Sequence, residues 1–183
     1  MEESGNHELK GCLNGITLLS ILVMLAGCTF LSTPESSSSV DLEWEMLVAS
    51  EEVGNNYSYQ GLEPKMVGIT DAKSADALTY ELQPIHSQTL KGINFGEDIA
   101  IVIYQGQKAT LGYSIDIDNV QFHGQEIIVN TRFLQPDQNW LENVTTSPYY
   151  ILRIKKESQL TGNLFLVLTD GEKEVFRTEF FIP

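Results

Sequence analysis

Hydrophobic and polar residues alternate along most of the chain after residue 41, with the period of two that is typical of β-strands. The run Asp98–Tyr104 is apolar on both faces after its first residue, which indicates a central strand covered on both sides. The run Leu111–Asp118 alternates cleanly and predicts a strand with one solvent-facing side. Because only the short glycine-containing segment 105–109 separates these runs, the pattern predicts that they pair as a hairpin.

Further alternating runs predict further strands, and two of them place glycines at turns. In the predicted strand Leu42–Ser50, the period puts Trp44, Met46 and Val48 on one side. His123-Gly124-Gln125 is a turn-like break, and Asp170-Gly171-Glu172 is a strong hairpin signal. The predicted strands are Leu42–Ser50, Val120–Phe122, Glu126–Phe133, Tyr149–Lys155, Asn163–Thr169 and Glu174–Ile182.

One helix is expected, over Ser74–Leu82, with Ser74 as its cap and Pro84 as the residue that stops it. At least six short strands and one short helix predict a mainly β fold. The architecture is either an antiparallel β-sandwich or a partly closed barrel. Residues 41–183 are therefore expected to form a single β-rich domain.

Two polar stretches, Glu51–Glu63 and Leu134–Pro148, are longer than the turns between the other strands. Trp140 in the second stretch is either an interface anchor or a lid that folds back on the domain. The hypothesis of an interface assigns partner contact to Trp140 and to the residues at and directly after the end of this stretch, Thr146, Ser147, Pro148 and Tyr149.

The N-terminal region has the pattern of a lipoprotein signal peptide, expected over residues 1–27. The apolar run Ile16–Gly27 has 12 residues, too few for a spanning helix but suited to the core of a secretory signal, although the residues before it are acidic rather than basic. The run ends in a lipobox, in which Leu25, Ala26 and Gly27 are the signal-peptidase recognition residues and the thiol of Cys28 accepts the lipid.

Residues 28–40 are expected to be a flexible tether after the lipidated cysteine, because the run Ser36–Ser39 cannot bury enough apolar area to become ordered. The predicted location is the cell membrane or the outer membrane, with the domain facing outside the cytoplasm. Both cysteines, Cys12 and Cys28, precede the domain, so no disulfide framework is predicted for it.

Charge and motif content limit the function classes. The net charge of −14 disfavours nucleic acid as a partner. No common nucleophile, zinc or phosphate-binding motif is present, and His86 and His123 are interpreted as solvated loop residues. Asp116 and Asp118 share a strand face, as calcium ligands might, but no third carboxylate accompanies them, so they are interpreted as a solvated face. The sequence predicts a noncatalytic protein without metal or cofactor.

Three segments carry a resemblance to a known family: Ile93–Phe95 leading into Asp98–Tyr104, then Gly106–Ile115, and last Thr146–Ile151. Over roughly Ile93–Lys155 the chain resembles the C-terminal domain of PrcB-like proteins, named after a lipoprotein subunit of a bacterial surface serine-protease complex. The motif residues are Thr110, Gly112 and Tyr113. Leu111 stands where the family usually has a second glycine, and Ala109 where it usually has a proline.

The resemblance implies a noncatalytic domain that stabilises or helps to mature a partner protease. We therefore expect a membrane-anchored lipoprotein that binds another exported protein. Two alternatives remain at this point. The segment Ala109–Tyr113 also resembles a loop of chagasin-like peptidase inhibitors, and the domain of an envelope lipoprotein can instead bind a small ligand.

Overall fold

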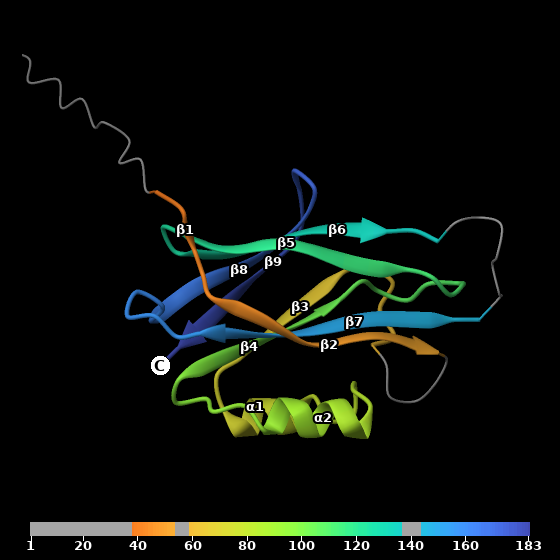
Figure 1. Cartoon of the computed structure of the whole chain (residues 1–183), viewed down its shortest axis with the longest axis horizontal. Coiled ribbons are helices and arrows are strands. Elements are labelled where there is room, and N and C mark those ends of the chain that lie inside the picture. The colour runs from red at the N-terminus through yellow and green to blue at the C-terminus, as the bar shows by residue number, and fades with distance from the viewer. Residues whose placement is uncertain (1–37, 54–58, 137–143) are drawn as a thin grey trace, which may run out of the picture. The chain divides into compact units, whose positions relative to one another are not determined.

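The computed structural model describes residues 38–53, 59–136 and 144–183, with the side chains of residues 51–53 left aside. All of these residues belong to one compact unit, residues 36–183 (Figure 1). In chain order its elements are β1 (Val40–Asp41), β2 (Trp44–Val53), β3 (Lys65–Ile69), α1 (Ala72–Ala77), α2 (Pro84–Lys91), β4 (Asp98–Tyr104), β5 (Ser114–His123), β6 (Glu126–Leu134), β7 (Thr146–Lys155), β8 (Gly162–Asp170) and β9 (Lys173–Ile182).

The strands form two separate sheets. Sheet A has the order β1-β5-β6-β8-β9, and sheet B has the order β2-β7-β4-β3. Neither sheet closes on itself, so the mainly β prediction is confirmed and the architecture is the sandwich rather than the barrel. All neighbouring strands are antiparallel except β6 and β8, which are parallel. This exception arises because β7 lies between them in sequence but belongs to sheet B, so the chain must cross over and return.

Two hydrophobic cores cover the two faces of sheet B. Alternate residues of β4, among them Ile99 and Ile101, pack against sheet A in the core between the sheets. The residues between them, such as Ala100 and Val102, pack in the second core under α1 and α2, which cover the outer face of sheet B (Figure 1). All seven residues of β4 are buried, as the apolar pattern on both faces of this strand predicts.

The helical region differs from the prediction. The first helix, α1, begins at Ala72, and its cap is Asp71 rather than Ser74. The Asp71 carboxylate accepts a hydrogen bond from the Ser74 backbone N–H at 2.9 Å, which lowers the pKa of Asp71. The sequence pattern did not predict α2. Pro84 begins this second helix instead of only ending the first, because its fixed φ suits the first helical turn.

The predicted hairpin between β4 and β5 is wrong, because the two strands lie in different sheets. Both sides of β4 are already paired, with β3 on one side and β7 on the other. Residues 105–113 therefore carry the chain from sheet B across to sheet A, and Leu111 and Tyr113 precede the first residue of β5, Ser114.

Strand β2 also departs from a simple alternation. A register shift against β7 lies between Met46 and Val48. As a result Trp44 packs on the core between the sheets, whereas Val48 belongs to the core under the helices and Met46 is exposed. The expectation that these three residues share one side is therefore wrong.

The edges of the two sheets meet at Gly68 on β3, where an added Cβ would lie 2.3 Å from the ring of Phe180 on β9. We expect Gly68→Ala to lower the free energy of unfolding by about 1–3 kcal/mol through overpacking, measured by urea denaturation. Combining it with Phe180→Leu should restore part of this loss. Gly124→Ala is the matched control, since nothing lies within 4 Å of its added Cβ and only its φ of +62° opposes the change. Equal losses for the two single variants, or no coupling with Phe180→Leu, would contradict the edge contact.

Candidate functional site

The motif segments from the two ends of the family resemblance meet at one end of the sandwich. The crossing segment, residues 105–113, runs beside the start of β7. The backbone N–H of Gln105 donates to the carbonyl of Pro148 at 3.0 Å. Lys108 and Thr146 exchange two backbone hydrogen bonds of 2.8 and 2.9 Å. Residues that are about 40 positions apart in sequence thus form one backbone arrangement.

A third segment, residues 59–63, joins this arrangement. The backbone N–H of Gln107 donates to the carbonyl of Gly61 at 2.8 Å. The hydroxyl of Ser147 donates to the carbonyl of Tyr59 at 2.8 Å, and the hydroxyl of Thr146 donates to the carbonyl of Thr110 at 2.9 Å. These buried hydroxyls hold the surrounding loops in place, because each satisfies a carbonyl that no strand pairs.

Two glycines make the close approach of these segments possible. Gly106 has a φ of +85°, and a Cβ at this position would lie 2.2 Å from the carbonyl oxygen of Leu62. Gly112 has a φ of +90°, and a Cβ there would lie 2.6 Å from the Cβ of Pro136. Any other residue at either position would combine a strained backbone with a clash.

The structure buries most of the side chains that were expected to contact a partner. Thr146, Ser147 and Tyr149 are at most 1% exposed, and Pro148 is buried with them. They form the floor of this end of the sandwich and are not accessible to a partner in this structure. The fifth expected contact, Trp140, lies outside the described residues, as do Cys28 and the recognition residues Leu25, Ala26 and Gly27.

A shallow groove lies above this floor, and we call it the motif-end groove. Its volume is about 250 Å³, and it is lined by Leu62, Gln107, Lys108, Ala109 and Thr145. The side chain of Leu62 is 69% exposed. Burial lowers the pKa of Lys108, whose ammonium lies 5.6 Å from the centre of the Tyr113 ring. The groove thus presents one exposed apolar side chain beside a partly desolvated lysine.

Sequence reasoning missed Leu62 and Lys108 as site residues. The available signal was Leu62 itself. It is the one leucine of the polar stretch Glu51–Glu63, and no strand period surrounds it, which is the pattern of an exposed apolar side chain. The motif residues were found, with different roles: Thr110 offers its carbonyl to Thr146, and Tyr113 is partly buried beside Lys108.

Behind the groove, ionisable and aromatic residues fill the space between sheet B and the helices. The Tyr149 hydroxyl lies 2.5 Å from Nδ1 of His86. His86 is therefore a packed residue of α2, and its interpretation as a solvated loop residue is wrong. Burial, together with the carboxylate of Glu81, raises the pKa of Tyr104 far above its usual range, so this hydroxyl stays neutral. Glu81 itself forms an ion pair with Lys65 at 3.2 Å.

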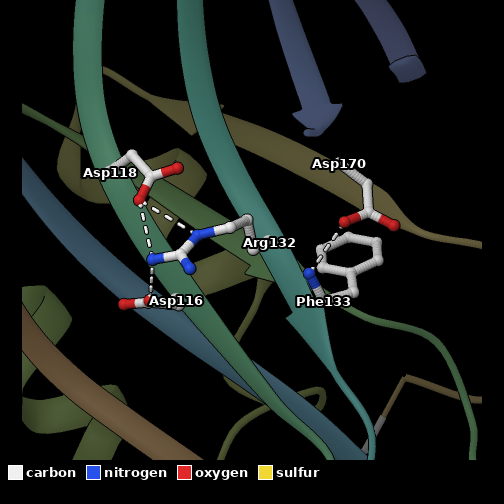
Figure 2. A network of polar contacts seen from close by, with 5 residues as sticks. All are labelled: Asp116, Asp118, Arg132, Phe133 and Asp170. Atoms are coloured by element: carbon white, nitrogen blue, oxygen red, sulfur yellow. Dashed lines mark hydrogen bonds and ion pairs between the residues drawn. The ribbon is translucent and has the colours of Figure 1, made fainter. Parts of the chain in front are cut away.

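His123 and the aspartate pair on β5 lie away from the groove. His123 is exposed at the end of β5. Asp116 and Asp118 lie on the outer face of sheet A, where both contact the guanidinium of Arg132 on β6 (Figure 2). These contacts raise the pKa of Arg132. The next residue, Phe133, is held separately, because its backbone N–H donates to the Asp170 carboxylate at 2.8 Å. On this exposed face one guanidinium offsets part of the charge of two carboxylates.

The described part of the chain contains neither a membrane-spanning helix nor a cluster of metal ligands. Among residues 38–53, 59–136 and 144–183, no helix is long and apolar enough to cross a membrane. In the same residues, no group of three or more His, Cys, Asp or Glu side chains is placed to hold a metal ion.

Comparison with known proteins gives one match. The family model described as PrcB C-terminal matches residues 99–155, which is about a third of the chain and extends from β4 to the end of β7. No curated protein and no solved structure matches the chain. The resemblance seen in the sequence over roughly Ile93–Lys155 is therefore confirmed, and residues 99–155 of this chain are a PrcB C-terminal-like segment.

Proposed function

We propose that this protein is a lipid-anchored, exported accessory lipoprotein whose β-domain binds and stabilises another exported protein, with a protease as the first partner to test. The observation that carries the proposal is the PrcB C-terminal match, because that family implies a subunit associated with a protease complex. Under this proposal, the domain is a noncatalytic binding module.

The motif-end groove is the proposed contact surface. The matched segment supplies four of its five lining residues, Gln107, Lys108, Ala109 and Thr145, and the backbone arrangement with the start of β7 fixes their positions. Rigid elements that present an exposed apolar side chain keep the entropic cost of binding low. Trp140, which precedes β7 in the sequence, is proposed as a second contact.

The anchor is proposed from the sequence Leu25-Ala26-Gly27-Cys28 at the end of an apolar run. A diacylated cysteine carries two chains, and two lipid chains give stable membrane attachment where one gives reversible binding. The Ser-rich residues before β1 then connect the lipid to the domain.

The groove is tested by Leu62→Asp. Because Leu62 is 69% exposed, this change should leave the thermal midpoint nearly unchanged. It should weaken capture of the partner by about tenfold or more if Leu62 is a contact, and Trp140→Ala should act in the same direction. The measurement is quantitative pull-down from solubilised membranes of the source cells, with the protein tagged after Pro183.

Phe181→Asp is the matched control for this experiment. Phe181 is also an exposed hydrophobic residue, 60% exposed, but it lies on β9 of sheet A. Equal partner capture by Leu62→Asp and the unchanged protein would rule out the groove. Equal losses for Leu62→Asp and Phe181→Asp would show a nonspecific effect of charge.

The anchor is tested by intact-mass analysis of protein from native membranes. The expected species begins at Cys28 and carries added acyl mass, and Cys28→Ala should lack both the cleavage and the acyl mass. An uncleaved chain without acyl mass in both proteins would remove the lipoprotein part of the proposal and leave the binding module untouched.

A further inference from the structure

A second hollow lies at the opposite end of sheet B from the motif-end groove. Its volume is about 220 Å³, and strands β2, β4 and β7 and the residues just before them line it. Strands β4 and β7 run from one hollow to the other, and seven residues of β4 correspond to about 20 Å. The charged residues that line the second hollow are Glu43, Glu45, Glu97, Asp98, Arg153 and Lys155. We call it the charged pocket.

The two cationic side chains of the charged pocket already have partners. Arg153 forms an ion pair with Glu45, and Lys155 lies 3.8 Å from the carboxylate of Glu97. Four carboxylates against two cations leave two negative charges without a counterion. The pocket therefore attracts a positively charged group rather than an anion.

Asp98 is the feature that indicates a ligand. The residue is only 9% exposed, and it lines the charged pocket. Among the described residues no hydrogen bond or ion pair holds its carboxylate, while its backbone N–H donates to the carbonyl of Asn94 at 2.9 Å. Its carboxylate oxygens are not among the buried unpaired atoms of the described residues, so they open into the charged pocket, where a ligand can reach them.

The walls of the charged pocket are fixed by backbone hydrogen bonds between its segments. The N–H of Lys155 donates to the carbonyl of Glu43 at 3.0 Å, and the N–H of Lys156 donates to the carbonyl of Glu97 at 2.8 Å. The ammonium of Lys156 donates to the carbonyl of Phe95 at 2.6 Å. A site on rigid strands holds its charges in position before a ligand arrives.

The size and the ligand set restrict the occupant. A cavity of about 220 Å³ is smaller than the range of about 300–1,000 Å³ that is typical of pockets for drug-sized ligands, so it suits a group the size of one side chain. No three acidic or histidine side chains of the described residues are arranged for a metal ion. We propose that the charged pocket binds a single organic cation, an ammonium or guanidinium group, through Asp98.

Such a cation has two sources, a lysine or arginine side chain of a partner protein or a free amine. Both are tested with the purified protein by following backbone amide signals around the pocket in ¹H–¹⁵N NMR titrations. The probes are methylguanidinium and the blocked peptide acetyl-Gly-Arg-Gly-amide, with acetyl-Gly-Gln-Gly-amide as the neutral comparison. Tighter binding of the arginine peptide than of methylguanidinium would indicate a partner side chain, and equal binding would indicate a free small-molecule cation.

Asp98→Asn should weaken binding of the cationic probes by about tenfold or more, because it removes the charge of the buried acceptor. The same change should leave the thermal midpoint nearly unchanged, since the carboxylate holds no hydrogen bond or ion pair within the described residues. Glu172→Gln is the matched control. It removes the same charge from an exposed turn between β8 and β9 and should alter neither quantity.

Three results would overturn the proposal: no signal change with either cationic probe, equal affinity in the Asp98→Asn variant, or a marked fall in its thermal midpoint. The last result would show that Asp98 stabilises the fold through contacts of its own. None of these outcomes depends on the motif-end groove, so the charged pocket and the proposed partner contact succeed or fail separately.

Discussion

The pairing of β7 with both of its neighbours is the constraint on which most of this structure depends. β7 is antiparallel to β2 on one side and to β4 on the other, along almost its whole length. Its side chains enter both cores, with Leu152 between the sheets and Ile151 under the helices. The hydroxyl of Tyr150 also accepts a hydrogen bond from the backbone N–H of Ile115 at 3.1 Å, which ties sheet B to the start of β5 in sheet A. Because β7 is fixed over its length, its two ends hold fixed positions as well.

Those two ends hold the two hollows of the domain. Thr146 and Ser147 at the start of β7 fix the loops of the motif-end groove by donating to loop carbonyls. Arg153 and Lys155 near its last residues line the charged pocket. The PrcB C-terminal match covers β4 and β7 together, so it covers the strands that hold the two sites apart. Strands β4 and β7 thus extend from one site to the other.

The period of two was sufficient to predict the mainly β fold and the burial of β4, because burial on one or both faces is a local property of the pattern. It could not predict which strands pair. The short segment after Tyr104 looks like a hairpin, yet β3 and β7 occupy both edges of β4 and the chain must leave the sheet. Pro84 was interpreted as a helix stop, although proline equally suits a helix start. The bulge near Leu47 changes which side chains share a face and leaves no mark in the sequence.

The candidate site was predictable in place but not in detail. The sequence indicated that the segments around Gly112 and Ser147 matter, and the structure brings these segments together. It did not predict the burial of Thr146 and Ser147, because their hydroxyls donate to the carbonyls of Thr110 and Tyr59, which are distant in sequence. Asp98 was noted only as the one polar residue of an apolar strand. Its burial beside a cavity depends on β2 and β7, which are distant in sequence.

The place where the chain enters the domain has a consequence for its orientation. Val40 of β1 pairs with Phe122, near the end of β5 that is farthest from Ser114 and from the motif-end groove. The chain therefore enters the domain at the end that holds the charged pocket, where Glu43 follows β1, and the motif-end groove lies at the other end. Under the proposed anchoring, a partner that binds the groove contacts the end of the domain away from the entering chain.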